Sequence, residues 1–282
     1  MTFRQLSKIT NALLNSELKV DLNGANLKND ITTQLLIKKK RITANIINKE
    51  SIIFCGGIFI KNFYREKFPE ITVKVIHKEG AEIKKNSILI TLVGNANLIL
   101  TTERTILNFL QHLCSISTET SHFVSRIKKF KTKLLDTRKT TTGLRKLEKY
   151  ATQTGGAVNH RLGLYDDILI KDNHIKALGG VDEMIEILKK KKIENYKVEC
   201  DNFFQVKKCI GAGAKYILLD NMKPHQVKKI INSSTKESVI FEISGGINLS
   251  NITEYVKVGA HFISTSKITL CTKPVDISLD LI

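Results

Sequence analysis

From Lys133 to Lys267 the chain repeats one pattern, in which short apolar segments alternate with turns and helical stretches. The apolar segments are KLLDT, DILIKD, YKVEC, KYILLD, VIFEIS and HFISTS. The helical stretches VDEMIEILKKKK, NFFQVKKCIGAG and KPHQVKKIINSS fall between the later ones. Repeated strand-then-helix units imply a parallel sheet with right-handed crossovers. Six such strands predict either a barrel or a doubly wound sheet.

Polar residues stand at the end of every one of these predicted strands. In either architecture the active site lies at the carboxyl ends of the strands. One polar strand end is ordinary loop chemistry, but six on the same rim predict a single pocket. The ends read Asp136-Thr137-Arg138-Lys139, Lys171-Asp172-Asn173-His174, Glu199-Cys200-Asp201, Asp220-Asn221, Ser244-Gly245-Gly246 and Ser264-Thr265-Ser266-Lys267, and a further segment, GGAVNHR, ends in His160-Arg161.

The chemistry of these ends separates into three parts. A cationic set suits a small polyanion, because arginine forks bind carboxylates through two hydrogen bonds. Glu199 and Asp220 are carboxylates on neighbouring strands, suited to Mg2+ that itself carries phosphates. The Ser244–Gly246 turn offers backbone N–H groups near an expected helix start, as a phosphate cradle does. The combination predicts a phosphorylated, multiply anionic substrate. The cationic set is Arg138, Lys139, His160, Arg161 and Lys171.

Each of these residues also has a structural interpretation when taken alone. Glu199 or Asp220 is more often a salt-bridge or capping residue, and a single histidine such as His160 is more often a satisfied structural one. Asp136 is expected to orient Arg138 or to cap backbone rather than to do chemistry. Arg145 is expected on a helix or the surface. It is their joint occurrence on one rim that favours a phosphate-handling site.

The first hundred residues mix strand and helix patterns. ITANIIN and SILITLVGNA read as strands, and ITVKVIHKEG alternates with a period of two. From Thr102 onward apolar residues recur at helical spacing. They predict a long amphipathic helix with Thr101-Thr102-Glu103 near its N-terminus.

The net charge of +18 raises the question of nucleic-acid binding. Lysines are spread along the chain, as in RIKKFKTK and LKKKKIENYK, and aromatic residues are not interleaved with them. This pattern is more typical of solvated helix faces than of a nucleic-acid groove. No apolar run reaches the length of a membrane span, and the start MTFRQLSKIT does not resemble a signal peptide. The five cysteines show no metal or CxxC spacing, so reduced thiols and a cytoplasmic location are expected.

The segment DTRKTTTGLRKLEKYATQTGGAVNHRLGLYDDILIKDNHI closely resembles the signature region of the quinolinate phosphoribosyltransferases, the carboxylating nicotinate-nucleotide pyrophosphorylases of NAD biosynthesis. TTERTILNFLQHLCSISTET is similar to the interdomain helix of that family, and VECD, GAKYILLDN and FEISGGI to its later strands. The resemblance covers nearly the whole chain. It implies an α/β fold with an N-terminal α/β sandwich domain over residues 1–106. This domain would be followed by an incomplete, open TIM-like α/β barrel over 107–267. A tail over 268–282 would then return to the first domain.

The resemblance also implies an activity and its residues. The expected enzyme is a pentosyltransferase that joins quinolinate to phosphoribosyl pyrophosphate with loss of CO2. Family members are homodimers with shared active sites, or dimers within hexamers, and Arg104 would reach in from the partner subunit. Quinolinate would be held by Arg138, His160, Arg161 and Lys171, and phosphoribosyl pyrophosphate would face Lys139 and Lys171. Mg2+ and the ribose hydroxyls would be held by Glu199 and Asp220. The 5′-phosphate would be held by Ser244, Gly245, Gly246 and the backbone around Ser264, Thr265 and Ser266. Lys139, Lys171, Glu199 and Asp220 would be the catalytic residues.

Three positions depart from the family pattern. Thr142 replaces the usual proline of the loop, Ala157 replaces a glycine before the Asn-His-Arg segment, and Ser266 replaces a glycine of the last phosphate loop. The first predicts a less rigid loop, and the last predicts a weaker approach of backbone to phosphate.

Two rival functions remain open. One is a paralogue of the same fold that uses another anionic substrate, of the molybdate-operon type or a nicotinate phosphoribosyltransferase. The retained Lys171 in LIKDNH argues against the molybdate-operon rival. The other is a basic nucleic-acid-binding protein on the same scaffold, which would show a lysine stripe and an eroded pocket.

Overall fold

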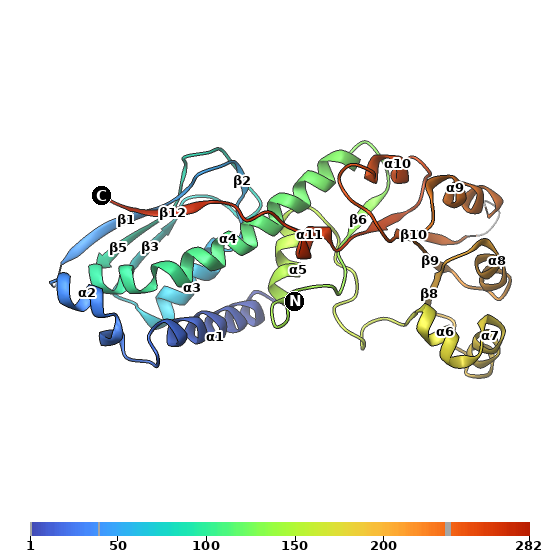
Figure 1. Cartoon of the computed structure of the whole chain (residues 1–282), viewed down its shortest axis with the longest axis horizontal. Coiled ribbons are helices and arrows are strands. Elements are labelled where there is room, and N and C mark those ends of the chain that lie inside the picture. Colours follow the sequence, from blue (N-terminus) through green and yellow to red (C-terminus); the bar gives the residue numbers. More distant parts are fainter. Residues whose placement is uncertain (1, 39, 235–237) are drawn as a thin grey trace. The chain divides into compact units, whose positions relative to one another are not determined.

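The computed structural model describes residues 2–38, 40–234 and 238–282 (Figure 1). The chain forms two compact units: residues 1–121, 146–156 and 272–282 make the first, and residues 122–145 and 157–271 make the second. The predicted boundary at residue 106 therefore falls inside the first unit. Residues 146–156, expected in the barrel, belong to the first unit because Leu147 and Ala151 are buried in its core. The tail that joins the first unit begins at Thr272 rather than at residue 268.

A four-stranded antiparallel sheet forms the first unit, in the order β12-β1-β5-β3. The two segments with strand patterns at residues 71–80 and 87–96 become β3 and β5, as predicted. The C-terminal segment supplies β12, which pairs antiparallel with β1. A separate two-stranded ladder joins β2 to β4. The bounds are β1 Arg41–Asn48, β2 Ile52–Ile53, β3 Thr72–Val75, β4 Glu82–Ile83, β5 Ile88–Asn95 and β12 Ile277–Leu281.

Helices cover this sheet, and their apolar faces form the first core. Figure 1 shows α1, α3 and α4 layered against the strands. Phe59 lies in the middle of this core, where its ring meets Phe109 at 6.4 Å and Tyr150 at 5.0 Å between centroids. Such a buried aromatic contributes about 3–5 kcal/mol. The bounds are α1 Phe3–Asp21, η1 Leu27–Asn29, α2 Ile31–Leu36, α3 Gly57–Lys67 and α4 Ala96–Ile127.

The long helix α4 begins earlier than its sequence pattern predicts. Its first residue is Ala96, so Thr102 lies inside the helix, fully buried, rather than at its N-terminus. The Thr102 hydroxyl donates to the Leu98 carbonyl at 2.7 Å. A threonine that bonds the preceding turn in this way can sit in a helix interior. The start is instead marked by Asn95, whose side chain accepts the Asn97 N–H at 2.9 Å.

The second unit contains all six predicted strands, in one parallel sheet of order β6-β11-β10-β9-β8-β7. This is the chain order with the first strand placed beside the last. A doubly wound sheet would instead reverse direction at a switch point, so the order is that of a barrel. Among the described residues β6 and β7 do not pair, and the barrel is open there. The bounds are β6 Lys133–Leu135, β7 Leu169–Ile170, β8 Lys197–Cys200, β9 Tyr216–Asp220, β10 Ile240–Ser244 and β11 Phe262–Ser264.

Strand geometry sorts the side chains of this sheet into two faces. Successive residues of a strand point to opposite sides. Val198, Ile217 and Phe241 belong to the apolar core of the second unit. The alternate residues, among them Glu199 and Asp220, therefore point to the other face. The helices of this part of the chain are α5 Arg145–Thr154, α6 Asp172–Leu178, α7 Val181–Lys190, α8 Phe203–Gly211, α9 Pro224–Ser233, α10 Ile252–Val256 and α11 Lys267–Leu270.

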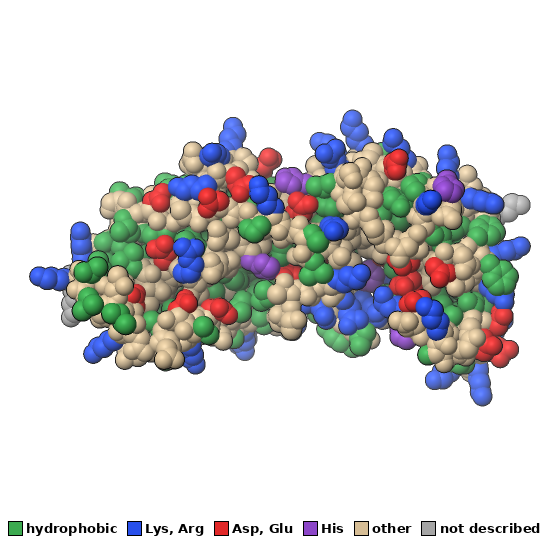
Figure 2. Space-filling view, viewed as in Figure 1, with side chains coloured by type: hydrophobic (Ala, Val, Ile, Leu, Met, Phe, Trp, Pro, Cys, Tyr) green, Lys and Arg blue, Asp and Glu red, His purple; other side chains and the backbone are tan. Residues whose placement is uncertain are grey.

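Basic side chains are dispersed over the face that Figure 2 shows. Figure 2 shows Lys and Arg side chains scattered across the visible face, with Asp and Glu among them. Some form ion pairs, such as Lys176 with Asp172 at 3.0 Å and Lys49 with Asp280 at 3.3 Å. On this face the basic side chains are interspersed with acidic ones rather than gathered into a lysine stripe. Within the described ranges, none of the helices is both long enough and apolar enough to cross a membrane.

Candidate active site

A cavity of about 370 Å3 opens at the carboxyl ends of the parallel strands. This volume is in the range of small-molecule pockets. Every predicted site residue of the second unit lines it. Arg104 does not; it is exposed on α4, in the first unit. The predicted residues in the lining are Arg138, Lys139, His160, Arg161, Lys171, Glu199, Asp220, Ser244, Gly245, Gly246, Ser264, Thr265 and Ser266.

Arg138 enters the cavity from the loop after β6. Its Nε is buried and has no hydrogen-bond partner among the described residues. A buried donor left unsatisfied costs about 1–3 kcal/mol, so this guanidinium is set to receive an acceptor from a ligand. The loop itself is held at its base: the Lys139 carbonyl accepts the Thr269 hydroxyl at 2.8 Å. Arg145, expected on a helix or the surface, begins α5 and donates to the Leu162 carbonyl at 3.4 Å.

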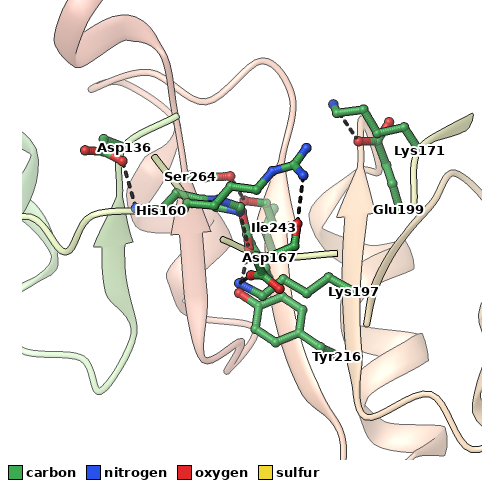
Figure 3. Close-up of polar contacts among 11 residues, drawn as sticks. Asp136, His160, Asp167, Lys171, Lys197, Glu199, Tyr216, Ile243 and Ser264 are labelled. Carbon is green, nitrogen blue, oxygen red and sulfur yellow. Dashed lines mark hydrogen bonds and ion pairs between the residues drawn. The ribbon is translucent and has the colours of Figure 1, made fainter. Parts of the chain in front are cut away.

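The Asn-His-Arg segment forms the floor of the cavity and is fixed by its own hydrogen bonds. Fully buried Asp136 accepts the His160 N–H at 2.8 Å, which is the backbone-capping role expected for it (Figure 3). His160 Nδ1 accepts the Arg161 N–H at 2.7 Å. Arg161 Nη1 donates to the Asp167 carbonyl at 3.0 Å. Burial, and then the charge of Arg138, lower the pKa of Arg161. Both arginines line the same cavity, which therefore carries positive charge suited to an anion.

Lys171 and Glu199 face each other on neighbouring strands. Lys171 Nζ lies 3.1 Å from Glu199 Oε2, and Figure 3 shows the two side chains pointing toward one another. Lys171 is also the N-cap residue of α6. Burial raises the pKa of Asp220, against the opposing charges of Lys171 and Lys139. Lys171 is thus near both carboxylates, and Lys139 is near Asp220.

Glu199 and Asp220 also border a smaller cavity of about 190 Å3 with Asp172 and Asp201. Among the described residues, no group of three or more His, Cys, Asp or Glu is arranged to hold a metal ion. Mg2+ does not need such a cage, because it is commonly bound by one or two carboxylates together with waters and substrate phosphates. The two carboxylates fit that mode.

The Ser244–Gly246 turn has the geometry of an anion cradle. Gly245 and Gly246 both have left-handed backbones, with φ of 90° and 65°. In the described part of the chain, neither glycine N–H donates a hydrogen bond. The expected helix start is not adjacent, since α10 begins only at Ile252. The donors that this turn offers are therefore its own peptides. Successive backbone N–H groups of such turns bind anions.

The structure shows the surroundings of the three positions that depart from the family pattern. Ser266 has an ordinary φ of −88°, so the backbone at this position does not require glycine. Ala157 is buried in the second core. Thr142 is exposed, next to Gly143 at φ 84° in a turn that the Leu144 N–H closes onto the Thr141 carbonyl at 3.0 Å.

Glu242 is the site residue that sequence reasoning missed. It lines the cavity and is fully buried. Its Oε2 accepts the Tyr216 hydroxyl at 2.6 Å and lies 3.5 Å from His160 Nε2. The sequence search considered only residues after the last apolar position of each strand, and Ile243 follows Glu242. The available signal was the period of two, which places Glu242 on the same face as Ser244.

Replacing Glu242 with glutamine is expected to destabilise the fold by about 1–3 kcal/mol near neutral pH, because a buried charged partner is lost. Burial alone would raise the pKa of Glu242, but His160, Ser264 and Tyr216 outweigh it and hold that pKa below its ordinary value. Such a carboxyl stabilises the folded state above the ordinary glutamate pKa of about 4.3. This contribution is lost as pH falls through the lowered pKa.

The Tm difference between wild type and Glu242→Gln should therefore shrink as pH falls below about 4. Thermal unfolding of both proteins across this range measures it. A difference that stays constant with pH would contradict the assigned charge state of Glu242.

Comparison with known proteins places the chain in a family. The family profile described as "Quinolinate phosphoribosyl transferase, N-terminal domain" matches residues 30–114, and the one described as "Quinolinate phosphoribosyl transferase, C-terminal domain" matches residues 116–280. A probable nicotinate-nucleotide pyrophosphorylase (carboxylating) of Methanocaldococcus jannaschii is 39% identical over 267 residues, which cover 90% of this chain and 92% of the relative. A probable enzyme of the same name from Bacillus subtilis is 37% identical over 258 residues, 89% of this chain and 88% of the relative.

Solved structures agree. The nicotinate-nucleotide pyrophosphorylase from Francisella tularensis has a TM-score of 0.90 and 35% identity over 98% of this chain and 97% of its own. Both domain profiles, the curated relatives and this fold point the same way. The chain belongs to the quinolinate phosphoribosyltransferase family.

Proposed function

We propose that this protein transfers the phosphoribosyl group of phosphoribosyl pyrophosphate to quinolinate in de novo NAD biosynthesis. The products are nicotinate mononucleotide, pyrophosphate and CO2. One observation carries the proposal: a single cavity joins an arginine-rich floor, a lysine–carboxylate pair and a glycine turn with unbonded N–H groups. These are the separate requirements of a dicarboxylate, a ribose with its metal ion, and a phosphate.

Quinolinate would bind at the floor of the cavity. Its two adjacent carboxylates need several cationic donors, and arginine forks meet carboxylates in two-pronged fashion. Arg138 has an unsatisfied buried Nε, and Arg161 lies close enough for its pKa to be lowered by Arg138. A dicarboxylate between them would relieve this repulsion. His160 and Lys171 complete the set.

Phosphoribosyl pyrophosphate would lie along the opposite side. The N–H groups of Gly245 and Gly246, with the backbone around Ser264 to Ser266, would hold its 5′-phosphate. Lys139 and Lys171 would face the pyrophosphate. Both lysines are exposed, so their ammonium groups can follow the leaving group as it departs.

Glu199 and Asp220 would hold Mg2+ and the ribose hydroxyls. When bound, Mg2+ would neutralise charge on the pyrophosphate. The carboxylates also place two negative charges beside the ribose, where positive charge develops. Lys171 keeps Glu199 in position through its ion pair. The Asn221 amide does the same for Asp220, donating to Oδ2 at 2.6 Å.

The reaction then follows from the charges. The ring nitrogen of quinolinate attacks C1 of the ribose, and the bond from C1 to the pyrophosphate oxygen breaks with its electron pair leaving on oxygen. The pyridine nitrogen is now positive. The bond between C2 and its carboxylate breaks, CO2 departs, and the remaining electron pair at C2 is stabilised by that nitrogen until a proton replaces the CO2. Fixed donors aimed at developing charge can be the largest contribution to such a reaction.

A turnover assay tests the proposal. Purified protein with quinolinate, phosphoribosyl pyrophosphate and Mg2+ should make nicotinate mononucleotide, identified by chromatography. Nicotinate should not replace quinolinate, because it lacks the C2 carboxylate that the cationic floor of the cavity would bind. Turnover of nicotinate without turnover of quinolinate would show that quinolinate is not the substrate.

We also propose a homodimer whose subunits share their active sites, alone or within a larger assembly. Arg104 is exposed on α4 and is not among the residues lining the cavity of its own chain. Helix α2 exposes Ile31, Leu35 and Leu36 by 70%, 77% and 73%. Clustered apolar exposure of this kind is typical of interaction surfaces.

Mixing two inactive variants tests this sharing. Arg104→Ala and Arg138→Ala should each lose most activity, whereas a hybrid dimer with Arg104→Ala on one subunit and Arg138→Ala on the other should form one intact site. The mixture should recover up to about a quarter of wild-type activity, as expected for random pairing in a closed dimer. Confirmed hybrids without recovery would refute shared sites.

The proposed location is the cytoplasm. All five cysteines are free thiols, and four of them are buried. Free thiols persist in the reducing cytosol.

A further inference from the structure

A second polar layer lies at the starts of the parallel strands, beneath the floor of the active-site cavity. Tyr216 begins β9 and Lys197 begins β8. Lys197 Nζ pairs with Asp167 at 2.7 Å and lies 4.4 Å from the centre of the Tyr216 ring. Figure 3 shows these three side chains together. A cavity of about 320 Å3 opens on this layer, and His160 and Arg161 line both this cavity and the active-site cavity.

Glu242 joins the two layers. Its carboxylate accepts the Tyr216 hydroxyl at 2.6 Å and lies 3.5 Å from His160 Nε2. Its other oxygen, Oε1, is buried and has no hydrogen-bond partner among the described residues. Burial of a charge is strongly unfavourable unless the charge is paired and hydrogen-bonded, so this carboxylate depends on Tyr216 and His160. An apolar residue would need none of these partners, so the carboxylate calls for a specific role.

The hydrogen bonds of His160 indicate that role. Its Nδ1 accepts the Arg161 N–H at 2.7 Å, so the ring proton must be on Nε2, which faces Glu242. The partner of one imidazole nitrogen sets the tautomer and orientation of the ring. If the ring turned over, Nε2 would no longer meet Glu242 and Nδ1 would release the Arg161 peptide. The position of Arg161 thus depends on Glu242 through His160.

We propose that Glu242 is a positioning residue for quinolinate binding. It holds the Nε2–H tautomer of His160, and through His160 the backbone of Arg161, in the arrangement that receives the carboxylates. The Tyr216 hydroxyl holds the Glu242 carboxylate in place through its hydrogen bond. The inference rests on the proposed function for its substrate. The new element is that the binding of quinolinate at the floor of the cavity depends on residues one layer below those that would touch it.

The kinetic test uses Glu242→Gln, which keeps the shape and removes the charge. The KM for quinolinate should rise about tenfold or more, as expected for the loss of a charged hydrogen-bond partner. The KM for phosphoribosyl pyrophosphate should stay unchanged, because its proposed contacts lie on other residues. Tyr216→Phe should shift the quinolinate KM in the same direction by a smaller factor. Glu254→Gln, on the exposed side of α10, is the matched control and should change neither constant.

The second readout is the tautomer of the His160 ring. Nitrogen NMR of histidine-labelled protein at mildly alkaline pH measures it, and the His160→Asn variant assigns the signal. The wild type should show a protonated Nε2 and an unprotonated Nδ1. Glu242→Gln should show a mixture of tautomers, since an amide can donate to Nε2 as well as accept from it. If Glu242→Gln does not fold, Tyr216→Phe provides both readouts.

An unchanged tautomer with an unchanged quinolinate KM would overturn the proposal, and equal increases in both KM values would show general loosening and would also overturn it. The tautomer measurement does not depend on turnover. A failure of the proposed function, seen as no quinolinate turnover by the wild type, is therefore distinguishable from a failure of the inference.

Discussion

Arg138→Ala is expected to lower kcat/KM for quinolinate by about a thousandfold, which corresponds to about 4 kcal/mol of lost binding in the transition state. Arg138 reaches the cavity from the loop after β6, and its buried Nε has no partner among the described residues. A carboxylate of quinolinate would be that partner. Removing the guanidinium would leave the carboxylate desolvated and unpaired, which is the costly case for a buried charge. Steady-state kinetics with quinolinate varied at saturating phosphoribosyl pyrophosphate measure the effect.

Two further variants separate charge from geometry. Arg138→Lys keeps the charge but lacks the planar fork, so it should recover only part of the loss. Arg126→Ala, at the exposed end of α4, is the matched control and should behave as wild type. Wild-type kcat/KM in Arg138→Ala would show that the loop after β6 does not bind quinolinate.

Gly245→Ala is expected to raise the KM for phosphoribosyl pyrophosphate about a hundredfold, equivalent to about 3 kcal/mol. Gly245 has a φ of 90°, where a side chain is strained by about 1–3 kcal/mol. An added Cβ would also lie 2.2 Å from Asn221 Oδ1 and 2.7 Å from the Asn221 nitrogen. Because the backbone cannot yield without moving the turn, the N–H groups that face the 5′-phosphate would be displaced.

Another glycine provides the control for this experiment. Gly259 has the same φ of 90°, but a Cβ there would meet no atom within 4 Å. Gly259→Ala should therefore lower Tm through backbone strain and leave the KM for phosphoribosyl pyrophosphate unchanged. Equal KM values for the Gly245 and Gly259 variants would argue that the Ser244–Gly246 turn does not hold the phosphate.

The strand pattern was sufficient to predict the six strands of the second unit and most of the residues that line its pocket. A rule about strand ends placed eleven residues of the sequence around one cavity, and the segment GGAVNHR added His160 and Arg161. It worked because the carboxyl ends of parallel strands must lie on one rim, whatever the intervening helices do. The choice between barrel and doubly wound sheet could not be made from the pattern, since strand order depends on long-range pairing. The pairing of β6 with β11 decides it.

The sequence was misleading where a local pattern fits more than one structural role. Thr102 looks like a helix start, yet its hydroxyl bonds the preceding turn inside α4. Helix α5 follows β6 in the chain, yet Leu147 is buried with the first core, so the domain boundary is not a single point. Glu242 was missed because the chemistry was sought only beyond the last apolar residue. For Leu147 and Glu242 the tertiary partner, not the local pattern, determines the role.

In the proposed reaction, one cavity both forms the nucleotide bond and removes the C2 carboxylate. The most direct measurement uses quinolinate labelled at that carboxylate, with phosphoribosyl pyrophosphate and Mg2+, and counts three products in one reaction. We expect equal amounts of labelled CO2, pyrophosphate and nicotinate mononucleotide, and loss of all three together in Arg138→Ala. Pyrophosphate release without labelled CO2, or no product from quinolinate while nicotinate is converted, would contradict it.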